Sequence, residues 1–272
     1  MTEEDFKQCS EFIHAELGIK LPPAKKTMLE ARLQKRLRVL GLATYGEYCD
    51  YLFTSEGMAG ELGSLINAVT TNTTDFFREP KHFDFLSGHV LPEWMAANGP
   101  HRRLRLWSAG CSVGMEPYTL AMVLNEFKAV SAGFTFSILA TDISSQALEK
   151  AVAGIYEEDR VAPVPDALKR KYLLRSKDRT RRLVRIAPEV RKQIAFKRLN
   201  FMDAFSFREP MDIIFCRNVI IYFDRPTQEV LFQKFCQHLR PGGYIFIGHS
   251  ESLAGMDLPL RQTAPTVYRK GS

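Results

Sequence analysis

The first 70 residues carry apolar positions at helical spacing and no run that suggests a strand. Between Lys25 and Leu40, four leucines recur every three or four positions, which predicts an amphipathic helix with a leucine face. Gly41 follows where this helix is expected to end, because glycine readily adopts the left-handed conformation. Further helices are expected over residues 6–17, 45–52 and 61–69. The pattern therefore predicts a helical N-terminal domain over residues 1–70.

From residue 104 onward, short apolar runs alternate with helical segments. The apolar runs occupy residues 104–110, 134–144, 194–200, 211–219 and 244–251. Helices are expected between several of them, such as Glu116 to Phe127 and Arg225 to Leu239. This alternation is typical of an α/β domain with a mainly parallel sheet, which we expect over residues 71–272. A charged segment from about residue 170 to 197 interrupts it, and Leu183, Val184 and Ile186 suggest a strand there, so we interpret this segment as a small β-rich insertion.

Composition and charge narrow the class of protein and of partner. The chain has 272 residues, 45% of them apolar and 25% charged, which is ordinary for a globular protein. Its net charge of +6 favours an acidic partner, namely nucleic acid, an anionic membrane surface or an acidic protein. Five scattered cysteines without a CxxC pair favour reduced thiols in a cytoplasm and no zinc site. We expect neither a secretion signal nor a membrane helix.

A glycine-rich segment follows the first apolar run of the α/β region. It reads LRLWSAGCSVGMEPYTLA, in which Gly110 and Gly114 precede a helix that begins near Glu116 and Pro117. Glycines at such a turn let a ligand approach the backbone closely. A plain strand-to-helix turn would also need small residues, so this segment alone does not establish a binding site.

Polar residues also stand at the ends of three other predicted strands. Asp142 ends the second strand, where an acidic residue often binds ribose hydroxyls in sheets of this kind. It could instead cap the next helix, a role that Ser144 could equally take. Asn200 ends the third predicted strand, and Arg217 and Asn218 follow the fourth. Together these residues favour a nucleoside-bearing cofactor at the carboxyl edge of the sheet.

Five motifs in this order resemble the CheR-type chemotaxis receptor methyltransferases. They are VTTNTTDFFRE, WSAGCSVGMEPYTLA, ATDIS, FCRNVIIYFD and GHSES, and the resemblance covers nearly the whole chain. It implies a class I (Rossmann-like) methyltransferase fold that binds S-adenosylmethionine and releases S-adenosylhomocysteine, without a metal. The implied reaction esterifies glutamate side chains of methyl-accepting chemotaxis receptors. We expect a cytoplasmic monomer that is recruited to membrane receptor arrays, and whether a regulatory protein also binds it stays open.

The same resemblance implies roles for individual residues. The implied cofactor contacts are Asn72, Thr74, Arg78, Glu116, Asp142, Asn200, Phe201, Arg217 and Asn218. Asp142 would hold the ribose, and Asn200 and Phe201 would lie by the adenine. Arg78 and Tyr222 would be the catalytic residues, with Tyr222 facing the methyl-donor sulfur. One departure is Met115, where the family commonly has an acidic residue.

The implied chemistry needs little machinery, because a glutamate side chain is already ionised at neutral pH. It requires no general base, so catalysis should depend on positioning and on exclusion of water. Arg78 could hold either the incoming carboxylate or the carboxylate of the cofactor.

The predicted helix that ends at Leu40 is strongly basic. Between Lys20 and Leu40 there are seven basic residues and one acidic residue. With the family resemblance, this charge favours docking of the helix on acidic receptor helices, although a basic face is more often only solvated. The expected docking residues are Arg32, Lys35, Arg36 and Arg38, of which Arg32 and Arg36 share a face.

Other interpretations remain open beside this one. The basic charge also suits a nucleic-acid methyltransferase, but CRNV replaces the Asn/Asp-Pro-Pro-aromatic sequence of amino-methylating DNA enzymes. A non-catalytic regulatory module that binds S-adenosylmethionine is a third possibility. GHSES departs from the hydrolase motif GxSxG, and the six histidines show no ligand spacing. Finally, the loop from Ser176 to Arg182 lacks the glycines of family members that tether a receptor peptide, so we expect no such tether.

Overall fold

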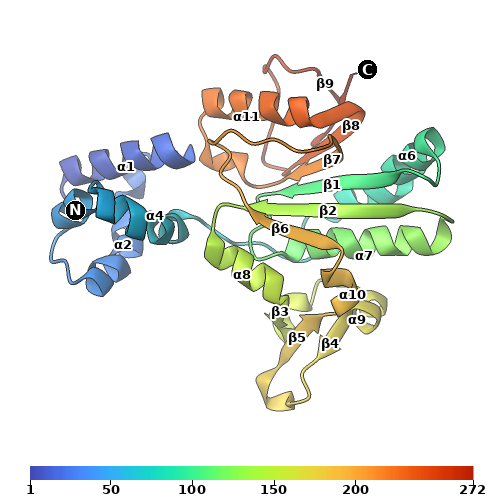
Figure 1. Cartoon of the computed structure of the whole chain (residues 1–272), viewed down its shortest axis with the longest axis horizontal. Coiled ribbons are helices and arrows are strands. Elements are labelled where there is room, and N and C mark those ends of the chain that lie inside the picture. Colours follow the sequence, from blue (N-terminus) through green and yellow to red (C-terminus); the bar gives the residue numbers. More distant parts are fainter. Residues whose placement is uncertain (272) are drawn as a thin grey trace.

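The computed structural model describes residues 1–271, apart from the side chain of Arg179. A helical domain at the N-terminal end of the chain lies beside a larger α/β domain, and a small sheet extends from the latter (Figure 1). Within residues 1–271, no helix is long and apolar enough to cross a membrane.

The N-terminal domain consists of four helices around a core of its own. These are α1 (Glu3–Leu17), α2 (Lys26–Leu40), α3 (Tyr45–Leu52) and α4 (Ser55–Val69). The leucine face of α2 is buried as predicted, and Gly41 ends the helix at a φ of 69°. Helix α4 begins earlier than the expected residue 61, because Thr54 caps it by accepting the N–H of Gly57 at 3.0 Å. Three glycines in its first turns hide the helical pattern.

The α/β domain is built on a seven-stranded sheet. Its strands are β1 (Arg103–Ala109), β2 (Thr135–Asp142), β6 (Ile194–Arg198), β7 (Met211–Cys216), β8 (Leu239–Ile247), β9 (Leu260–Ala264) and β10 (Val267–Lys270). The order across the sheet is β6-β2-β1-β7-β8-β10-β9. The first five are parallel, and β10 is antiparallel to both of its neighbours. The mainly parallel sheet is therefore confirmed, but β9 and β10 were not expected, because they are short strands with mostly polar sequences.

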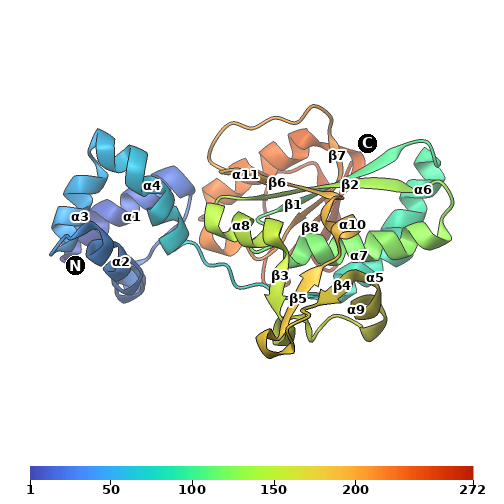
Figure 2. The same cartoon turned by 60° about the horizontal axis from the view of Figure 1, so that its bottom comes forward.

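Helices cover both faces of this sheet (Figure 2). They are α5 (Lys81–Phe85), a π-helical turn (Leu86–Val90), α6 (Leu91–Asn98), α7 (Met115–Val130), α8 (Ser145–Ala153) and α11 (Arg225–His238). Side chains alternate between the faces along each strand. In β1, Leu106 joins the core under α7, whereas Trp107 joins the core under α11. Burial on both faces explains why β7 is an unbroken buried run.

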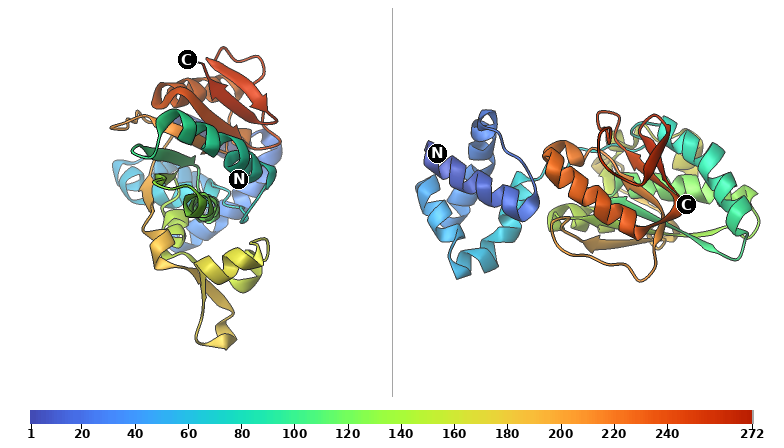
Figure 3. Two further views of the ribbon diagram at one scale, coloured as in Figure 1. Left: turned by 90° about the vertical axis from the view of Figure 1, so that its right-hand side faces the viewer. Right: turned by 90° about the horizontal axis from the view of Figure 1, so that it is seen from above.

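The small sheet has three antiparallel strands in the order β3-β5-β4. They are β3 (Ile155–Glu157), β4 (Leu173–Arg175) and β5 (Leu183–Ile186), with helices α9 (Asp166–Tyr172) and α10 (Pro188–Arg191) beside them. It lies at the end of the molecule away from α11 (Figure 3). The predicted limits of 170 and 197 are wrong, because β3 already starts at residue 155 and β6 belongs to the main sheet. Strand β3 has only three residues, too few to show an alternating pattern.

The N-terminal domain faces the carboxyl ends of the parallel strands. Its segment after α1 pairs with the loop after β7, through an antiparallel bridge between Ile19 and Phe223. Beside this bridge, the backbone N–H of Lys20 donates to the carbonyl of Tyr222 at 2.8 Å. These contacts place helical-domain residues at the edge where open parallel sheets bind ligands.

Candidate cofactor site

A cavity of about 580 Å³ lies between the two domains, within the range of small-molecule sites. The helical domain contributes Lys20 and Arg32 to its wall, and the strand ends of the sheet form the opposite side. All ten residues implied as cofactor-binding or catalytic line it, namely Asn72, Thr74, Arg78, Glu116, Asp142, Asn200, Phe201, Arg217, Asn218 and Tyr222. The structure therefore brings together residues that are spread over 150 positions of sequence.

The glycine-rich turn after β1 forms one end of the cavity. Gly110 and Gly114 have φ angles of 82° and 90°, a conformation that other residues rarely adopt. A Cβ atom on Gly110 would lie 2.5 Å from Val219, and one on Gly114 would lie 2.8 Å from Ala151. Both glycines are thus required by the backbone and by neighbouring protein atoms. Close approach of a ligand, the reason expected from the sequence, is not needed to explain them.

Asp142 lies at the end of β2, next to this turn. Its two carboxylate oxygens accept the backbone N–H groups of Ser112 at 2.7 Å and Ser144 at 2.9 Å. Burial raises the pKa of Asp142, and these N–H groups oppose the rise. Ser144 caps α8 by accepting the N–H of Ala147, as the sequence suggested. Because each oxygen has a second lone pair, Asp142 can still accept the hydroxyls of a ribose in the cavity.

Arg217 is a buried cation between two carboxylates. It lies 3.1 Å from Glu79 and 3.4 Å from Glu116, with only 6% of its surface exposed. Ser108 donates its hydroxyl to Glu116 at 2.8 Å. Burial raises the pKa of Glu116, while Arg217 and then Ser108 oppose this. The guanidinium also lies over the ring of Phe83, 5.4 Å from its centre. Arg217 therefore offsets part of the negative charge of these two carboxylates.

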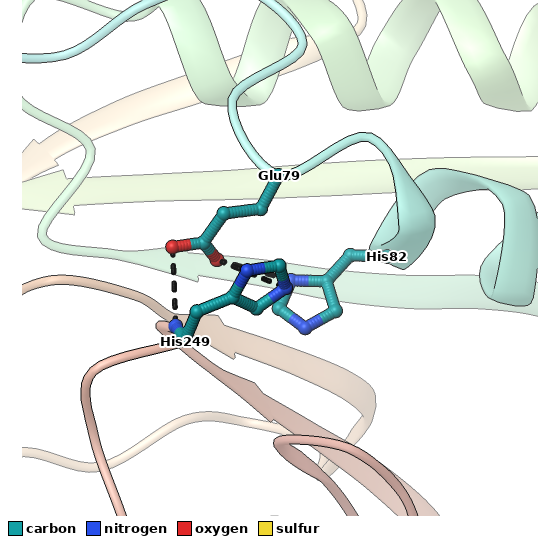
Figure 4. Close-up of side chains that lie close together, drawn as sticks. All are labelled: Glu79, His82 and His249. Atoms are coloured by element: carbon teal, nitrogen blue, oxygen red, sulfur yellow. Dashed lines mark hydrogen bonds and ion pairs between the residues drawn. The ribbon is translucent and has the colours of Figure 1, made fainter.

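Glu79 was missed by the sequence reasoning, although it belongs to the motif FFRE. Its carboxylate accepts the backbone N–H of His249 at 3.1 Å and lies 3.4 Å from Nδ1 of His82 (Figure 4). The expectation that the histidines lack ligand spacing holds along the sequence but fails in space, because these three side chains meet. The donor types suit a divalent cation, but Arg217 already places a positive charge 3.1 Å from the same carboxylate. The cluster is thus better explained as a set of polar contacts that holds these segments together than as a metal site.

Glu251, in the motif GHSES, was also missed. Its buried carboxylate accepts the backbone N–H groups of Gly248 at 2.6 Å, Asn218 at 3.0 Å and Ile220 at 3.0 Å. Asn218 has a φ of 59°, a left-handed conformation that such contacts stabilise. The 3-10 turn that begins at Ile220 ends at Tyr222. Glu251 therefore fixes the backbone that carries two of the cavity residues.

Arg78 and Tyr222 are the two residues expected to be catalytic. Both are half-buried and line the cavity. Among the described residues, the guanidinium of Arg78 makes a single long hydrogen bond, to the carbonyl of Thr73 at 3.4 Å. Its positive charge is thus left for an anionic ligand in the cavity.

The residues expected by the adenine sit where the two domains meet. The side-chain amide of Asn200 donates to the carbonyl of Glu16 in α1 at 2.8 Å. Phe201 packs against Trp107 and Phe235 and is 9% exposed. Asn200 therefore also bridges the domains.

The linker residues expected at the cofactor are held through their backbone. The backbone carbonyl of Asn72 accepts a hydrogen bond from the hydroxyl of Ser112 at 2.9 Å. The backbone carbonyl of Thr74 accepts one from the guanidinium of Arg160 at 2.5 Å. Met115, the departure from the family pattern, is buried in the core under α7 rather than in the cavity wall.

The basic residues of α2 differ in how they are used. Arg36 forms two hydrogen bonds of 2.8 and 2.6 Å with the buried carboxylate of Glu61. Arg32 donates to Thr71 and to backbone carbonyls at the end of α4, and it lines the cavity. Lys35 and Arg38 are exposed. The shared docking face expected of Arg32 and Arg36 is therefore not free, since both side chains are engaged within the domain.

Comparisons with known proteins agree with this architecture. A family model described as the SAM binding domain of CheR methyltransferase matches residues 72–268, and one described as its all-alpha domain matches residues 4–70. The chain is 41% identical to the chemotaxis protein methyltransferase of Borreliella burgdorferi, covering 99% of this chain and 95% of that protein. Identity to the chemotaxis protein methyltransferases of Klebsiella aerogenes and Escherichia coli is 37% and 35%, each covering 98% of this chain and at least 90% of the relative.

These matches confirm the resemblance seen in the motifs. With the observed strand order, they also confirm the Rossmann-like methyltransferase fold preceded by a helical domain. They support S-adenosylmethionine as the cofactor and methylation in chemotaxis as the activity. The chain belongs to the CheR methyltransferase family.

Proposed function

We propose that this protein transfers the methyl group of S-adenosylmethionine to glutamate carboxylates on the cytoplasmic domains of chemotaxis receptors. The observation that carries the proposal is an excess of cations in the described wall of the cavity, where five lysines and arginines accompany three carboxylates. Arg78 is a half-buried cation with no carboxylate partner among the described residues, and Lys20, Lys25 and Arg32 add positive charge on the side of the helical domain. An anionic side chain is the substrate that such a cavity favours.

The cavity fits S-adenosylmethionine in three respects. Asp142 has free acceptor capacity for a ribose. For the adenine, Phe201 offers an apolar surface, and Asn200 keeps a lone pair on its side-chain oxygen, which accepts one N–H, from Met202. Arg78 suits a carboxylate. When bound, the cofactor supplies an electrophilic methyl group on a positively charged sulfur.

The residues of this chain would act by positioning rather than by proton transfer. A glutamate enters as a carboxylate and needs no base. Arg78 would orient either this carboxylate or that of the cofactor, and Tyr222 would present its hydroxyl beside the reacting atoms. Glu251 supports this arrangement, because it holds the backbone of the turn that ends at Tyr222. Closure of the cavity by the helical domain would exclude water.

A nucleic-acid methyltransferase remains the second candidate, favoured by the net charge of +6. A non-catalytic module that binds S-adenosylmethionine is the third. One experiment separates them: the full chain is incubated with methyl-labelled S-adenosylmethionine and, in parallel, a receptor cytoplasmic fragment, duplex DNA or RNA. Label on the receptor fragment supports the proposal, label on nucleic acid supports the second candidate, and cofactor binding without transfer supports the third.

We propose further that the protein works as a monomer in the cytoplasm, at receptor arrays, without a peptide tether. In the small sheet, β3 and β4 form the two edges, and the loop between β4 and β5 carries Lys177, Arg181 and Arg182 and no glycine. Cationic side chains at an edge hinder addition of a strand. The loop suits an acidic regulatory protein instead. Low-micromolar binding of a receptor C-terminal pentapeptide in a titration would refute the absence of a tether.

A further inference from the structure

Two cysteine thiols face each other in the core of the helical domain. Cys9 on α1 and Cys49 on α3 have their Sγ atoms 2.7 Å apart, and each residue is 1% exposed. All five cysteines of the chain are free and buried. The other three, Cys111, Cys216 and Cys236, belong to the α/β domain. The pair is thus a local feature of the helical domain and plays no part in the cavity.

The distance between the two sulfurs is close to that in a disulfide. An S–S bond measures about 2.05 Å, so the two sulfurs need to approach by less than about 1 Å. Helices α1 and α3 already hold them on facing surfaces. Bond formation would therefore require only a short movement of the two sulfurs toward each other.

The hydrogen bond between the two thiols favours the thiolate form of one of them. The hydrogen bond with Cys9 lowers the pKa of Cys49, whereas the same bond and burial raise the pKa of Cys9. The thiolate is the nucleophile in disulfide chemistry, so Cys49 is the thiol that would react first. Because both thiols are buried, a small oxidant would reach the pair through local opening of the helical domain.

We propose that Cys9 and Cys49 are a reversible oxidation site, at which a peroxide or a disulfide oxidant cross-links α1 to α3. With hydrogen peroxide, the Cys49 thiolate attacks one oxygen, the O–O bond breaks, and a sulfenic acid and water form. The Cys9 sulfur then attacks the Cys49 sulfur, and the hydroxyl group leaves as a second water. The two thiols lose two electrons and two protons in total, and the peroxide is reduced to two molecules of water.

The cross-link would close a loop that contains the whole of α2. Such a loop restricts the unfolded chain and so stabilises the helical domain against unfolding. The cavity would keep its shape, because neither cysteine lines it. The oxidised protein is therefore a stapled form of the same fold rather than an inactive one.

The test treats the reduced full chain with hydrogen peroxide and, separately, with oxidised glutathione. Intact mass should fall by two hydrogens, and peptide mapping should find a Cys9–Cys49 cross-link that dithiothreitol removes. The urea midpoint of the helical domain should rise by about 1 M. Cys49→Ser should abolish both changes, whereas Cys236→Ser, outside the pair, should retain them. A folded wild-type protein that forms no cross-link, or that links other cysteines, would overturn the proposal, and this result does not depend on whether a variant folds.

Discussion

The guanidinium of Arg217 lies 3.1 Å from the carboxylate of Glu79, although 138 positions separate them in the chain. Arg217 follows strand β7, and Glu79 lies at the end of the linker that leaves the helical domain. Their pairing holds the linker residue Arg78 against the sheet, because Arg217 also donates to the backbone carbonyl of Arg78. The ion pair therefore connects the end of the sheet to the segment that carries Arg78.

Replacing Arg217 by Gln should destabilise the protein strongly. The change leaves Glu79 and Glu116 buried without their cation, which typically costs about 3–5 kcal/mol. The matched control is Arg182→Gln, because Arg182 pairs with Asp159 at 63% and 77% side-chain exposure and should cost less than about 1 kcal/mol. Urea unfolding measures both. Equal losses of unfolding free energy in the two variants would show that the buried ion pair stabilises the protein no more than the exposed one.

Glu251→Gln should reduce turnover more than cofactor affinity. The amide keeps one acceptor oxygen but presents an N–H₂ group to backbone donors that Glu251 now binds, so the turn carrying Tyr222 loses support. We expect kcat to fall by about tenfold or more, with a much smaller change in the Kd for cofactor. The exposed Glu189→Gln serves as control. An unchanged kcat in a folded Glu251→Gln protein would show that Glu251 does not position Tyr222 for the reaction.

Asp142→Ala should weaken cofactor binding by about 1.5–3 kcal/mol, the range for a hydrogen bond to a charged group. Because Asp142 also holds the N–H groups of Ser112 and Ser144, the thermal midpoint must be measured alongside. Isothermal calorimetry gives the affinity. If a folded variant binds S-adenosylmethionine as tightly as the wild type, the role of Asp142 is limited to its hydrogen bonds with the backbone of Ser112 and Ser144.

Stability should fall as the pH falls through the range set by His82. Burial, and then the charge of Arg217, lower the pKa of His82 to about 4, from about 6.5 in an unfolded chain. Between these values the unfolded chain binds the extra proton, so stability is fully present above about pH 6.5 and is lost toward pH 4. The loss should approach about 3 kcal/mol. His82→Gln should flatten the unfolding free energy over this range, and an unaltered slope would contradict the assignment.

Receptor docking should depend on Lys35 and Arg38 rather than on Arg36. Reversing Lys35 and Arg38 to Glu should raise the KM for receptor several-fold and leave cofactor binding unchanged, because both side chains are exposed on α2. Arg36→Glu should instead destabilise the helical domain, because it places a second carboxylate beside the buried carboxylate of Glu61. A wild-type KM in the Lys35 and Arg38 double variant would count against docking through this helix.

The sequence pattern predicts most of the architecture because that information is local. The leucine spacing of α2 and its stop at Gly41 depend on neighbouring residues alone. The cavity residues were likewise predictable, since each follows a recognisable strand or belongs to a family motif. By contrast, whether the side chain of Arg36 is free or paired depends on Glu61, which lies 25 positions away on another helix.

Three other features also depend on tertiary contacts. Glu251 looks like an ordinary polar loop residue until its three backbone partners are in place. Likewise, the meeting of Glu79, His82 and His249 has no counterpart in sequence spacing. Strand β3 is too short to be recognised without its partner β5. Such long-range pairs are set by the fold, and no local pattern encodes them.

The chemical bond formed on the receptor tests the central claim most directly. The full chain is incubated with methyl-labelled S-adenosylmethionine and a receptor cytoplasmic fragment, and the labelled fragment is then treated with mild base. We predict that base releases the label as methanol, because a glutamate methyl ester is hydrolysed, and that Arg78→Met strongly reduces labelling. Label that survives base on the fragment, or a receptor fragment that receives none from a protein that binds the cofactor, would contradict the account.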